Sequence, residues 1–350
     1  MAIERVTIQN LRGIRDGVVE GLSPLSILVG PNNSGKSTVL EGLWTVAAGA
    51  NAKVVWETLL RRGGPALHAA RHVLHGTTKQ AVAEAIGPDD QRCRVTLSIP
   101  ATRNVDRLRG AREEGLTEPM ISLRSEAEFT WAGQQNSSVS VTQVDRERRF
   151  AICFMEKGTY AMPFPTGIVD VEAVRAPGAL EDAYSKLEKQ RRVARVVQSL
   201  QRAMPTLTDL RILKVDEDFV LHAIHGDAPT VPTYLAGDGF KRFLEVAAQV
   251  YDAGKGGVVL LEEPESFQHP RYLTELAVVL RDAVALGTQV ILSTHSMELI
   301  DLLLQRPEGD VGPLPTVHRL RLTDGVLRAV AVSGESARYA REELAQDLRA

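Results

Sequence analysis

The sequence predicts an α/β fold in which a mainly parallel sheet is flanked by helices and accompanied by a mixed β lobe. Strand-like and helix-like segments alternate over the last third of the chain, which is typical of a parallel sheet covered on both faces. In the middle of the chain, strand-like runs follow one another instead. The 350 residues, 44% of them apolar and 24% charged, suffice for one large or two medium domains.

The N-terminal elements are two strands and a helix. Residues Ile3 to Gln9 alternate apolar and polar, Leu25 to Val29 are nearly all apolar, and Leu11-Arg12-Gly13 forms a turn between them. A helix is expected from Lys36 to about Ala47. Its apolar face consists of Val39, Leu40, Leu43 and Trp44.

Residues 50 to 160 predict a helical stretch near Val54 to Leu74 and then a series of strands. The expected strands are Arg94 to Ile99, Ile121 to Trp131, Ser137 to Val144 and Phe150 to Met155. Between the first two lies 102–118, a run with charges of both signs and two glycines. We expect a mobile surface loop there, because such runs rarely pack.

The second half begins with a helical pattern from Leu180 to Met204, ended by Pro205. Its basic face is interpreted as solvated, with a nucleic-acid or partner surface as the alternative. The elements expected after it are helix Gly239–Tyr251, strand Val258–Leu261, helix Tyr272–Ala285, strand Gln289–Ser293, helix Met297–Leu304, strands Val317–Leu322 and Leu327–Val332, and a terminal helix. The chain is expected to form one domain, 1–350, with lobes 1–160 and 161–350.

A phosphate-binding loop is the most specific motif. Gly30-Pro31-Asn32-Asn33-Ser34-Gly35-Lys36-Ser37-Thr38 contains every fixed position of G-x-x-x-x-G-K-[ST], between an apolar strand and an apolar-periodic helix. Gly30 and Gly35 permit the turn that directs backbone N–H groups at phosphate oxygens. Lys36 is expected to reach the β- and γ-phosphates of ATP, and the Ser37 hydroxyl to bind Mg²⁺.

An apolar strand that ends in two acids supplies the second part of such a site. In Val258-Val259-Leu260-Leu261-Glu262-Glu263, Glu262 is expected beside the Mg²⁺ shell and Glu263 near the attacking water. Hydrolysis needs one carboxylate committed to the metal and another that accepts a proton, so adjacent acids suit it. The next apolar strand ends in Ser293-Thr294-His295-Ser296, which places His295 near the γ-phosphate as a sensor.

The long interval between Lys36 and Glu262 is atypical of small GTPases and nucleoside kinases. The motif set resembles the ABC-type ATPase heads of the SMC/RecF group, and most closely the OLD (overcoming-lysogenization-defect) nuclease family. The residues that carry this resemblance are Val6 to Gly13, the P-loop, Glu262-Glu263-Pro264-Glu265 with His269-Pro270, and Ser293 to Ser296. The resemblance implies an ABC-type head that forms a homodimer or higher homo-oligomer around ATP.

The resemblance also implies a signature motif ahead of the helix that precedes the acidic strand. Leu235 to Arg242 lies there, and Gly237, Asp238, Gly239 and Lys241 are its candidate contacts to ATP bound by the other subunit. A helix N-terminus is suited to this contact because its free N–H groups and dipole attract phosphate. Ala236 stands where the pattern usually has serine.

OLD nucleases also carry a C-terminal Toprim domain, which needs an Asp-x-Asp motif. No such motif follows Gln305, so any nuclease activity is expected on a partner protein. The favoured hypothesis is an ATPase that regulates a nuclease-like effector in phage defence or DNA maintenance. The alternatives are a RecF-like repair ATPase acting directly on DNA and, ranked last, the nucleotide-binding subunit of a transporter.

Net charge, cysteine content and the N-terminal sequence indicate the class of protein and its cellular location. The net charge is −3, from 41 basic and 44 acidic residues, and therefore lacks the basic excess usual in proteins that bind nucleic acid alone. Cys93 and Cys153 stand apart from other metal ligands, so reduced, half-buried thiols are expected. The N-terminus resembles no signal peptide and no apolar run approaches about 20 residues, which predicts a cytoplasmic protein without a membrane span.

Overall fold

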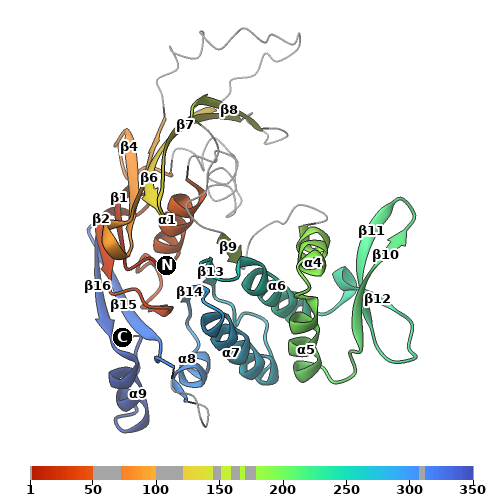
Figure 1. Cartoon of the computed structure of the whole chain (residues 1–350). Coiled ribbons are helices and arrows are strands. Elements are labelled where there is room, and N and C mark those ends of the chain that lie inside the picture. The colour runs from red at the N-terminus through yellow and green to blue at the C-terminus, as the bar shows by residue number, and fades with distance from the viewer. Residues whose placement is uncertain are drawn as a thin grey trace, which may run out of the picture. The chain divides into compact units, whose positions relative to one another are not determined.

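The computed structural model describes residues 2–49, 72–99, 121–144, 151–158, 166–169, 179–306 and 312–349 (Figure 1). These fall into two compact units. Unit 1 comprises Met1–Leu22, Pro31–Phe164 and Leu320–Val330, and unit 2 comprises Ser23–Gly30, Pro165–Arg319 and Ala331–Ala350. The expected loop 102–118 and nearly all of the expected helix at 54–74 lie outside the described residues.

Unit 1 contains a mainly antiparallel sheet. Across the sheet its strands are β8 (Ala151–Lys157), β7 (Gln134–Val144), β6 (Ile121–Trp131), β5 (Arg92–Ser98), β4 (Gln80–Ile86), β1 (Arg5–Leu11), β2 (Ile14–Glu20) and β16 (Val326–Val332). Only β16 runs parallel to its neighbour β2, with Leu327 opposite Gly17. Arg12, at φ 49°, makes the tight turn between β1 and β2.

The helix of unit 1 is α1 (Lys36–Ala48), which packs against β1, β4 and β5. Its buried apolar face includes Val39, Leu40, Leu43 and Val46. A short 3₁₀ helix, Pro88–Asp90, joins β4 to β5. The Cys93 thiol is buried in β5, and its Sγ donates to the Val46 carbonyl of α1 over 3.4 Å. The sequence predicted a half-buried thiol, whereas Cys93 is fully buried. This burial raises the pKa of the Cys93 thiol to about 12.

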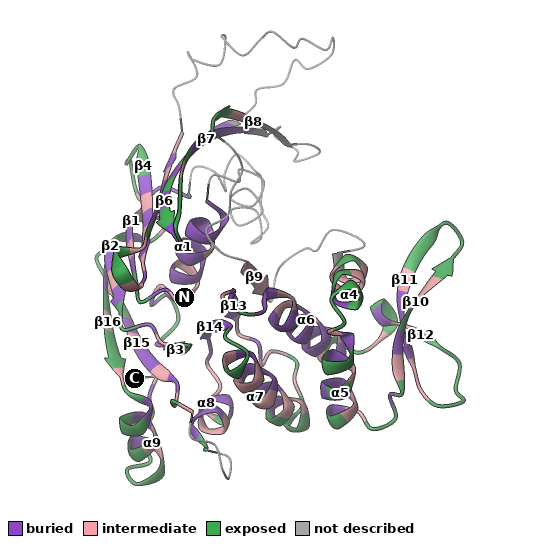
Figure 2. Cartoon of the chain, viewed as in Figure 1, coloured by how far each residue is buried: buried purple, intermediate pink, exposed green. Residues whose placement is uncertain are grey.

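Unit 2 contains a parallel sheet. Its strands, in order across the sheet, are β15 (Thr316–Thr323), β3 (Leu25–Val29), β14 (Gln289–Ser293), β13 (Val258–Glu262) and β9 (Thr166–Val169), and each pairs with its neighbour in parallel. Strands covered on both faces need apolar residues throughout, which explains why β3, β13 and β14 lack alternation. Figure 2 shows β13 and β14 buried along most of their length.

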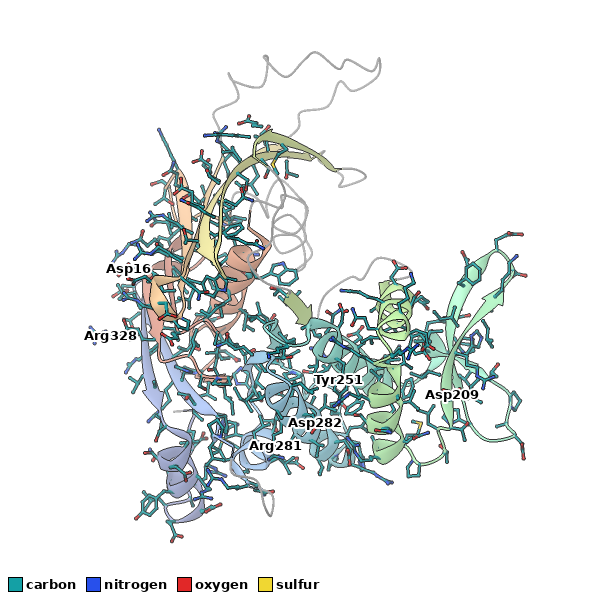
Figure 3. The ribbon with its side chains drawn as sticks, in the orientation of Figure 1. Asp16, Asp209, Tyr251, Arg281, Asp282 and Arg328 are labelled. Carbon is teal, nitrogen blue, oxygen red and sulfur yellow. The ribbon has the colours of Figure 1, made fainter. Side chains whose placement is uncertain are left out.

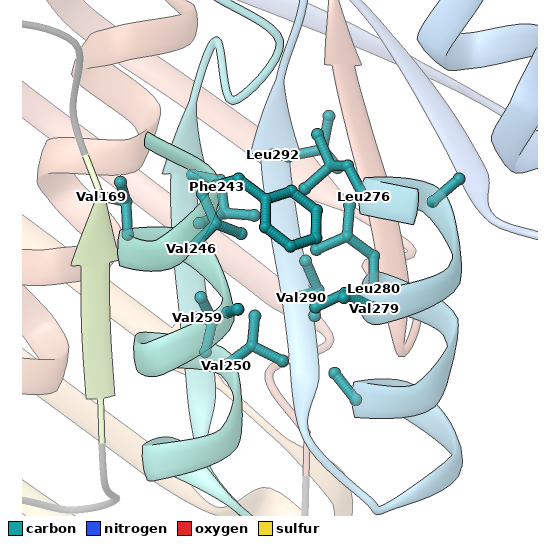
Figure 4. Close-up of a cluster of buried hydrophobic side chains, with 14 of the residues drawn as sticks. Val169, Phe243, Val246, Val250, Val259, Leu276, Val279, Leu280, Val290 and Leu292 are labelled. Carbon is teal, nitrogen blue, oxygen red and sulfur yellow. The ribbon is translucent and has the colours of Figure 1, made fainter. Parts of the chain in front are cut away.

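Helices cover this sheet. They are α4 (Ala179–Lys189), α5 (Val193–Ala203), α6 (Asp238–Ala253), α7 (Pro270–Ala285), α8 (Met297–Leu304) and α9 (Gly334–Glu342). Phe243 of α6 projects toward Leu276 of α7, and both lie over the buried valines and leucines of β13 and β14 (Figure 4). A second small sheet, of β10 (Asp209–Val215), β11 (Asp218–Ile224) and β12 (Val231–Pro232), leads through the 3₁₀ helix Thr233–Leu235 into α6.

The structure confirms the expected α/β fold with a parallel sheet flanked by helices. It differs at 180–204, where the single predicted helix is two helices, α4 and α5, separated at Arg191 in a left-handed conformation (φ 58°). Strands β2, β4, β10 and β11 were not expected from the sequence pattern. None of the described helices is long and apolar enough to cross a membrane.

Candidate active site

The strands next to the three predicted motifs are neighbours in the unit 2 sheet. Strands β3, β14 and β13 are neighbours and parallel, with Ser293 opposite both Leu28 and Glu262. Their carboxyl ends therefore lie side by side, the usual position of ligand sites in parallel sheets. Gly30 follows β3, Glu262 ends β13, and His295 follows β14.

The remainder of the P-loop belongs to unit 1 and begins α1. Gly35 is the N-cap residue, at φ 94° and ψ 3°, a conformation that costs L-residues energy. A Cβ on Gly35 would also lie 3.2 Å from Leu327 Cδ1. The Lys36 side chain is buried and its Nζ donates to the Pro31 carbonyl over 3.0 Å. The loop thus folds tightly around its own lysine.

The loop has the groups that a phosphate needs. The first N–H groups of α1 lack partners within the helix, and its first turn carries no acidic side chain to compete with an anion. Ser34 is buried, and its hydroxyl has no hydrogen-bond partner among the described residues. A buried polar atom without a partner is costly, and a phosphate oxygen would satisfy it. The residues present therefore fit the phosphates of a nucleotide.

An ion pair joins α1, the helix that follows the P-loop, to the β1–β2 turn. Arg12, in the β1–β2 turn, donates through Nε to the Glu41 carboxylate on α1. The Glu41 side chain is 2% exposed and that of Arg12 16%. This gives a structural role to Arg12, which the sequence offered only as part of a family resemblance.

Glu263 and His295 face one another in unit 2. Glu263 Oε1 lies 3.8 Å from His295 Nε2, too far for a hydrogen bond but close enough for attraction when the imidazole is protonated. Glu263 has φ 44°, and its N–H donates to the Ser293 carbonyl over 3.0 Å. Both side chains are more than a third exposed and so accessible to a substrate. The adjacent Glu262 carbonyl accepts from Arg242 Nη2 over 2.7 Å.

Glu265 links the acidic motif to the histidine loop, a role that the sequence did not assign. Its Oε1 accepts from the Thr294 hydroxyl over 2.5 Å and from the His295 N–H over 3.0 Å. Burial raises the pKa of the Glu265 carboxyl, while these hydrogen bonds oppose the rise. The only sequence signal was its position in Glu-Glu-Pro-Glu.

The signature-like segment begins α6, as expected. Gly237 is the N-cap residue without a side-chain cap, and Lys241 Nζ pairs with Asp238 Oδ1 over 2.8 Å. A Cβ on Gly239 would lie 2.7 Å from the Phe267 carbonyl oxygen, so the helix start packs against the segment after the acidic motif. Two large apolar side chains just before this helix, Tyr234 and Leu235, are exposed, and so is that of Phe267 in the packed segment.

The predicted Mg²⁺ ligands are Ser37 in unit 1 and Glu262 in unit 2. Within the described ranges no group of three or more His, Cys, Asp or Glu side chains could hold a metal by itself. Mg²⁺ usually takes only one or two protein ligands and completes its shell with water and substrate phosphates. A hydroxyl and a carboxylate are therefore a suitable donor set for Mg²⁺ in the presence of a nucleotide.

Two family models match separate parts of the chain. Residues 1–95 match a model described as "AAA ATPase domain". Residues 169–301 match one described as "AAA domain, putative AbiEii toxin, Type IV TA system". The first match contains the P-loop and the second contains Glu262, Glu263 and His295.

Solved structures share the fold. The SMC head bound to the C-winged helix domain of ScpA superposes with a TM-score of 0.53 at 13% identity, covering 96% of this chain and 99% of that chain. A Pyrococcus furiosus Smc head with an extended coiled coil, bound to the C-terminal domain of ScpA, gives 0.51 at 13% identity, with 98% and 99% covered. At this identity the likeness shows an ABC-ATPase head fold.

A curated relative is closer in sequence. The uncharacterized protein MJECL11 of Methanocaldococcus jannaschii is 36% identical over 116 residues, which cover 32% of this chain and 98% of the relative. The chain therefore belongs to the family of MJECL11; two parts of it match AAA ATPase family models, and its fold is that of an ABC-ATPase head.

Proposed function

We propose that the chain binds ATP with Mg²⁺, hydrolyses it to ADP and phosphate, and forms a homodimer around the nucleotide. The observation that carries this proposal is the shared edge of β3, β14 and β13. Gly30, His295 and the Glu262–Glu263 pair follow or end these neighbouring parallel strands. The fold itself does not require these three motifs to follow adjacent strands, so their placement supports a shared function.

Each residue has a defined task in this reaction. The N–H groups of Gly35 to Thr38 and the Lys36 ammonium bind the β- and γ-phosphates. Glu263 accepts the proton of the attacking water as the new bond to the γ-phosphorus forms and the bond to the β-phosphate oxygen breaks. His295 hydrogen-bonds the γ-phosphate, so its environment changes when phosphate leaves. Ser37 and Glu262 would hold Mg²⁺, which would supply positive charge to neutralise the phosphates.

The signature-like start of α6 supports dimerisation. Gly237, Asp238, Gly239 and Lys241 lie at a helix N-terminus whose N–H groups have no side-chain cap. In the proposed dimer these groups bind the γ-phosphate held by the other protomer. The Asp238–Lys241 pair, at 2.8 Å, would then open so that the ammonium turns to the phosphate.

A protein effector is the proposed target of this cycle. The SMC heads with the same fold are bound to domains of ScpA, and one matched family model is described by a toxin of a toxin–antitoxin system. Both descriptions support regulation of a partner protein, which we propose to be nuclease-like and to act in phage defence or DNA maintenance. The ATPase part rests on residues of this chain, and the effector part rests on analogy.

Phosphate release by the purified chain tests the proposal. Wild type is expected to hydrolyse ATP in the presence of Mg²⁺, whereas Lys36→Ala and Glu263→Gln are expected to lose at least about 100-fold in kcat. Exposed Glu298 on α8 offers the matched control Glu298→Gln, which should retain the wild-type rate. A wild-type rate equal to that of Lys36→Ala would remove the proposal.

The same assay separates the RecF-like alternative. Direct action on DNA predicts hydrolysis that rises with added duplex and falls steeply with salt. A rate that DNA leaves unchanged would favour the protein effector.

A further inference from the structure

The peptide groups on either side of His295 are held by two residues distant from it in sequence, one before it and one after it. The His295 N–H donates to Glu265 over 3.0 Å, and the His295 carbonyl accepts from Arg349 Nη1 over 2.8 Å. Glu265 belongs to the acidic motif, whereas Arg349 lies beyond the last helix, α9. The backbone of the proposed sensor is therefore fixed by two charged side chains, and hydrogen bonds to charged groups are the stronger kind.

Arg349 is itself held in place. Its guanidinium pairs with Asp347, with Nε–Oδ1 at 2.9 Å and Nη2–Oδ2 at 2.7 Å. Hydrogen bonding to Arg349 lowers the pKa of the Asp347 carboxyl to about 2. Between them, Leu348 is 2% exposed and belongs to the core of unit 2. The planar guanidinium is thus oriented before it meets the His295 carbonyl.

The segment Gln346–Arg349 is also tied to α8, which begins just after His295. Arg341 of α9 pairs with Asp301 of α8 through two hydrogen bonds of 2.7 and 2.9 Å. Its third nitrogen donates to the Gln346 carbonyl over 2.8 Å. At the other end of α8, Arg281 of α7 donates to the Leu302 and Gln305 carbonyls (Figure 3). The histidine loop, α8 and the C-terminal segment therefore form one connected group.

We propose that Arg349 is a positioning residue for His295, and that the segment Gln346–Arg349 sets the rate of hydrolysis through this contact. The inference rests on the proposed ATP hydrolysis. Arg349 touches no reacting atom: it fixes the His295 peptide, and the peptide fixes where the imidazole points relative to Glu263. Without Arg349 the His295 carbonyl loses this charged donor, while the hydrogen bonds of Glu265 to Thr294 and His295 remain.

Steady-state kinetics of the full chain with Arg349→Ala test this role. Misplacing a catalytic group by about 1 Å costs up to about 100-fold in rate, so a fall of about tenfold in kcat is expected. The KM for ATP should stay unchanged, because the P-loop is untouched. Arg349→Lys should recover part of the rate, since an ammonium can still donate to the carbonyl.

A matched control and a double variant separate positioning from general destabilisation. Among the described residues, Arg338 of α9 forms its ion pairs with Glu335 and Glu342 of the same helix, so Arg338→Ala should leave kcat unchanged. If Arg349 acts through His295, adding Arg349→Ala to His295→Ala should cause no further loss. The urea midpoints of Arg349→Ala and Arg338→Ala should agree.

Four results would overturn the inference. Wild-type kcat in Arg349→Ala, or a full additional loss in the double variant, would refute positioning through His295 and leave the proposed ATPase intact. A rise in KM with constant kcat would assign Arg349 to substrate binding instead. Absence of hydrolysis in the wild type would remove the proposed function and the inference together.

Discussion

Glu263 Oε1 and His295 Nε2 lie 3.8 Å apart, on side chains that follow the ends of adjacent parallel strands. The backbone couples the same residues, because the Glu263 N–H donates to the Ser293 carbonyl two positions before His295. The proposed proton acceptor and the proposed phosphate sensor are thus linked through both their side chains and the main chain. A substitution of Glu263 is therefore expected to alter the environment of His295, and a substitution of His295 that of Glu263.

Replacing Glu263 by glutamine should stall the cycle with ATP bound. The amide cannot accept the water proton, whereas the P-loop remains able to bind phosphate. Light scattering of Glu263→Gln should show a mass that doubles when ATP and Mg²⁺ are added. An unchanged monomer would contradict the proposed sandwich and favour switching within one protomer. An assembly present without ATP would instead indicate a constitutive scaffold.

A side chain at Gly35 should damage the P-loop. Gly35→Ala imposes a Cβ at φ 94° and within 3.2 Å of Leu327, which costs about 1–2 kcal/mol of unfolding free energy. We also expect ATP affinity to fall by at least about tenfold in equilibrium titration, because the amides of α1 shift. Gly76→Ala is a suitable control, since Gly76 also has a positive φ (57°) but no atom within 4 Å of an added Cβ. Equal ATP affinity in both variants would refute the argument.

Breaking the Arg12–Glu41 pair should destabilise the protein strongly. Glu41→Gln leaves a largely buried guanidinium without its counter-charge, which costs about 3 kcal/mol in urea unfolding. The exposed Arg5–Glu20 pair, at 3.3 Å, provides the comparison. Glu20→Gln should change stability by less than about 0.5 kcal/mol. Similar losses in the two variants would show that the buried pair carries no special weight.

His318 should make the protein less stable in acid. It is fully buried in β15, and neither ring nitrogen has a hydrogen-bond partner in the part of the chain that the structure describes. Burial lowers its pKa from 6.5 to about 4. The unfolded chain takes up a proton near pH 6.5, while the folded chain does so only near pH 4. Stability from this residue is therefore complete above pH 6.5 and is lost as pH falls toward 4, by about 3 kcal/mol.

His318→Leu removes this dependence. Unfolding free energies at pH 7.5 and pH 5 should differ less in the variant than in the wild type, and the variant should be at least as stable at pH 7.5. A larger pH dependence in the variant would contradict the assignment.

The sequence predicted the parallel half of the fold well, because its strands are buried on both faces. β3, β14 and α8 have the bounds that the sequence pattern predicted. β2 and β10 were missed because partly exposed strands carry charged residues that hide any alternation. The helix break at Arg191 had no Gly or Pro to mark it. Local backbone hydrogen bonds hold the left-handed turn, from the Arg191 N–H to the Glu188 carbonyl and from the Arg192 N–H to the Leu187 carbonyl.

The site divides in the same way. Lys36, Glu263 and His295 stand in local motifs whose chemistry can be read from neighbours in sequence. Arg349 and Glu265 contact the histidine loop only through the tertiary fold, and no spacing rule predicts such contacts. A supporting residue is therefore identified only from the three-dimensional structure, whereas a candidate reacting residue can often be identified from its sequence motif.

The pairing of β3 has a consequence for biosynthesis. This strand is complete at Val29, yet its neighbours β14 and β15 begin only at Gln289 and Thr316. A nascent chain on the ribosome therefore carries its phosphate loop on a strand without hydrogen-bonding neighbours until most of the protein has emerged. Such distant pairings slow folding and leave apolar strands exposed meanwhile. The phosphate loop is therefore expected to become able to bind nucleotide only late in synthesis. Until β14 and β15 have been made, the exposed strand β3 is a possible binding site for chaperones.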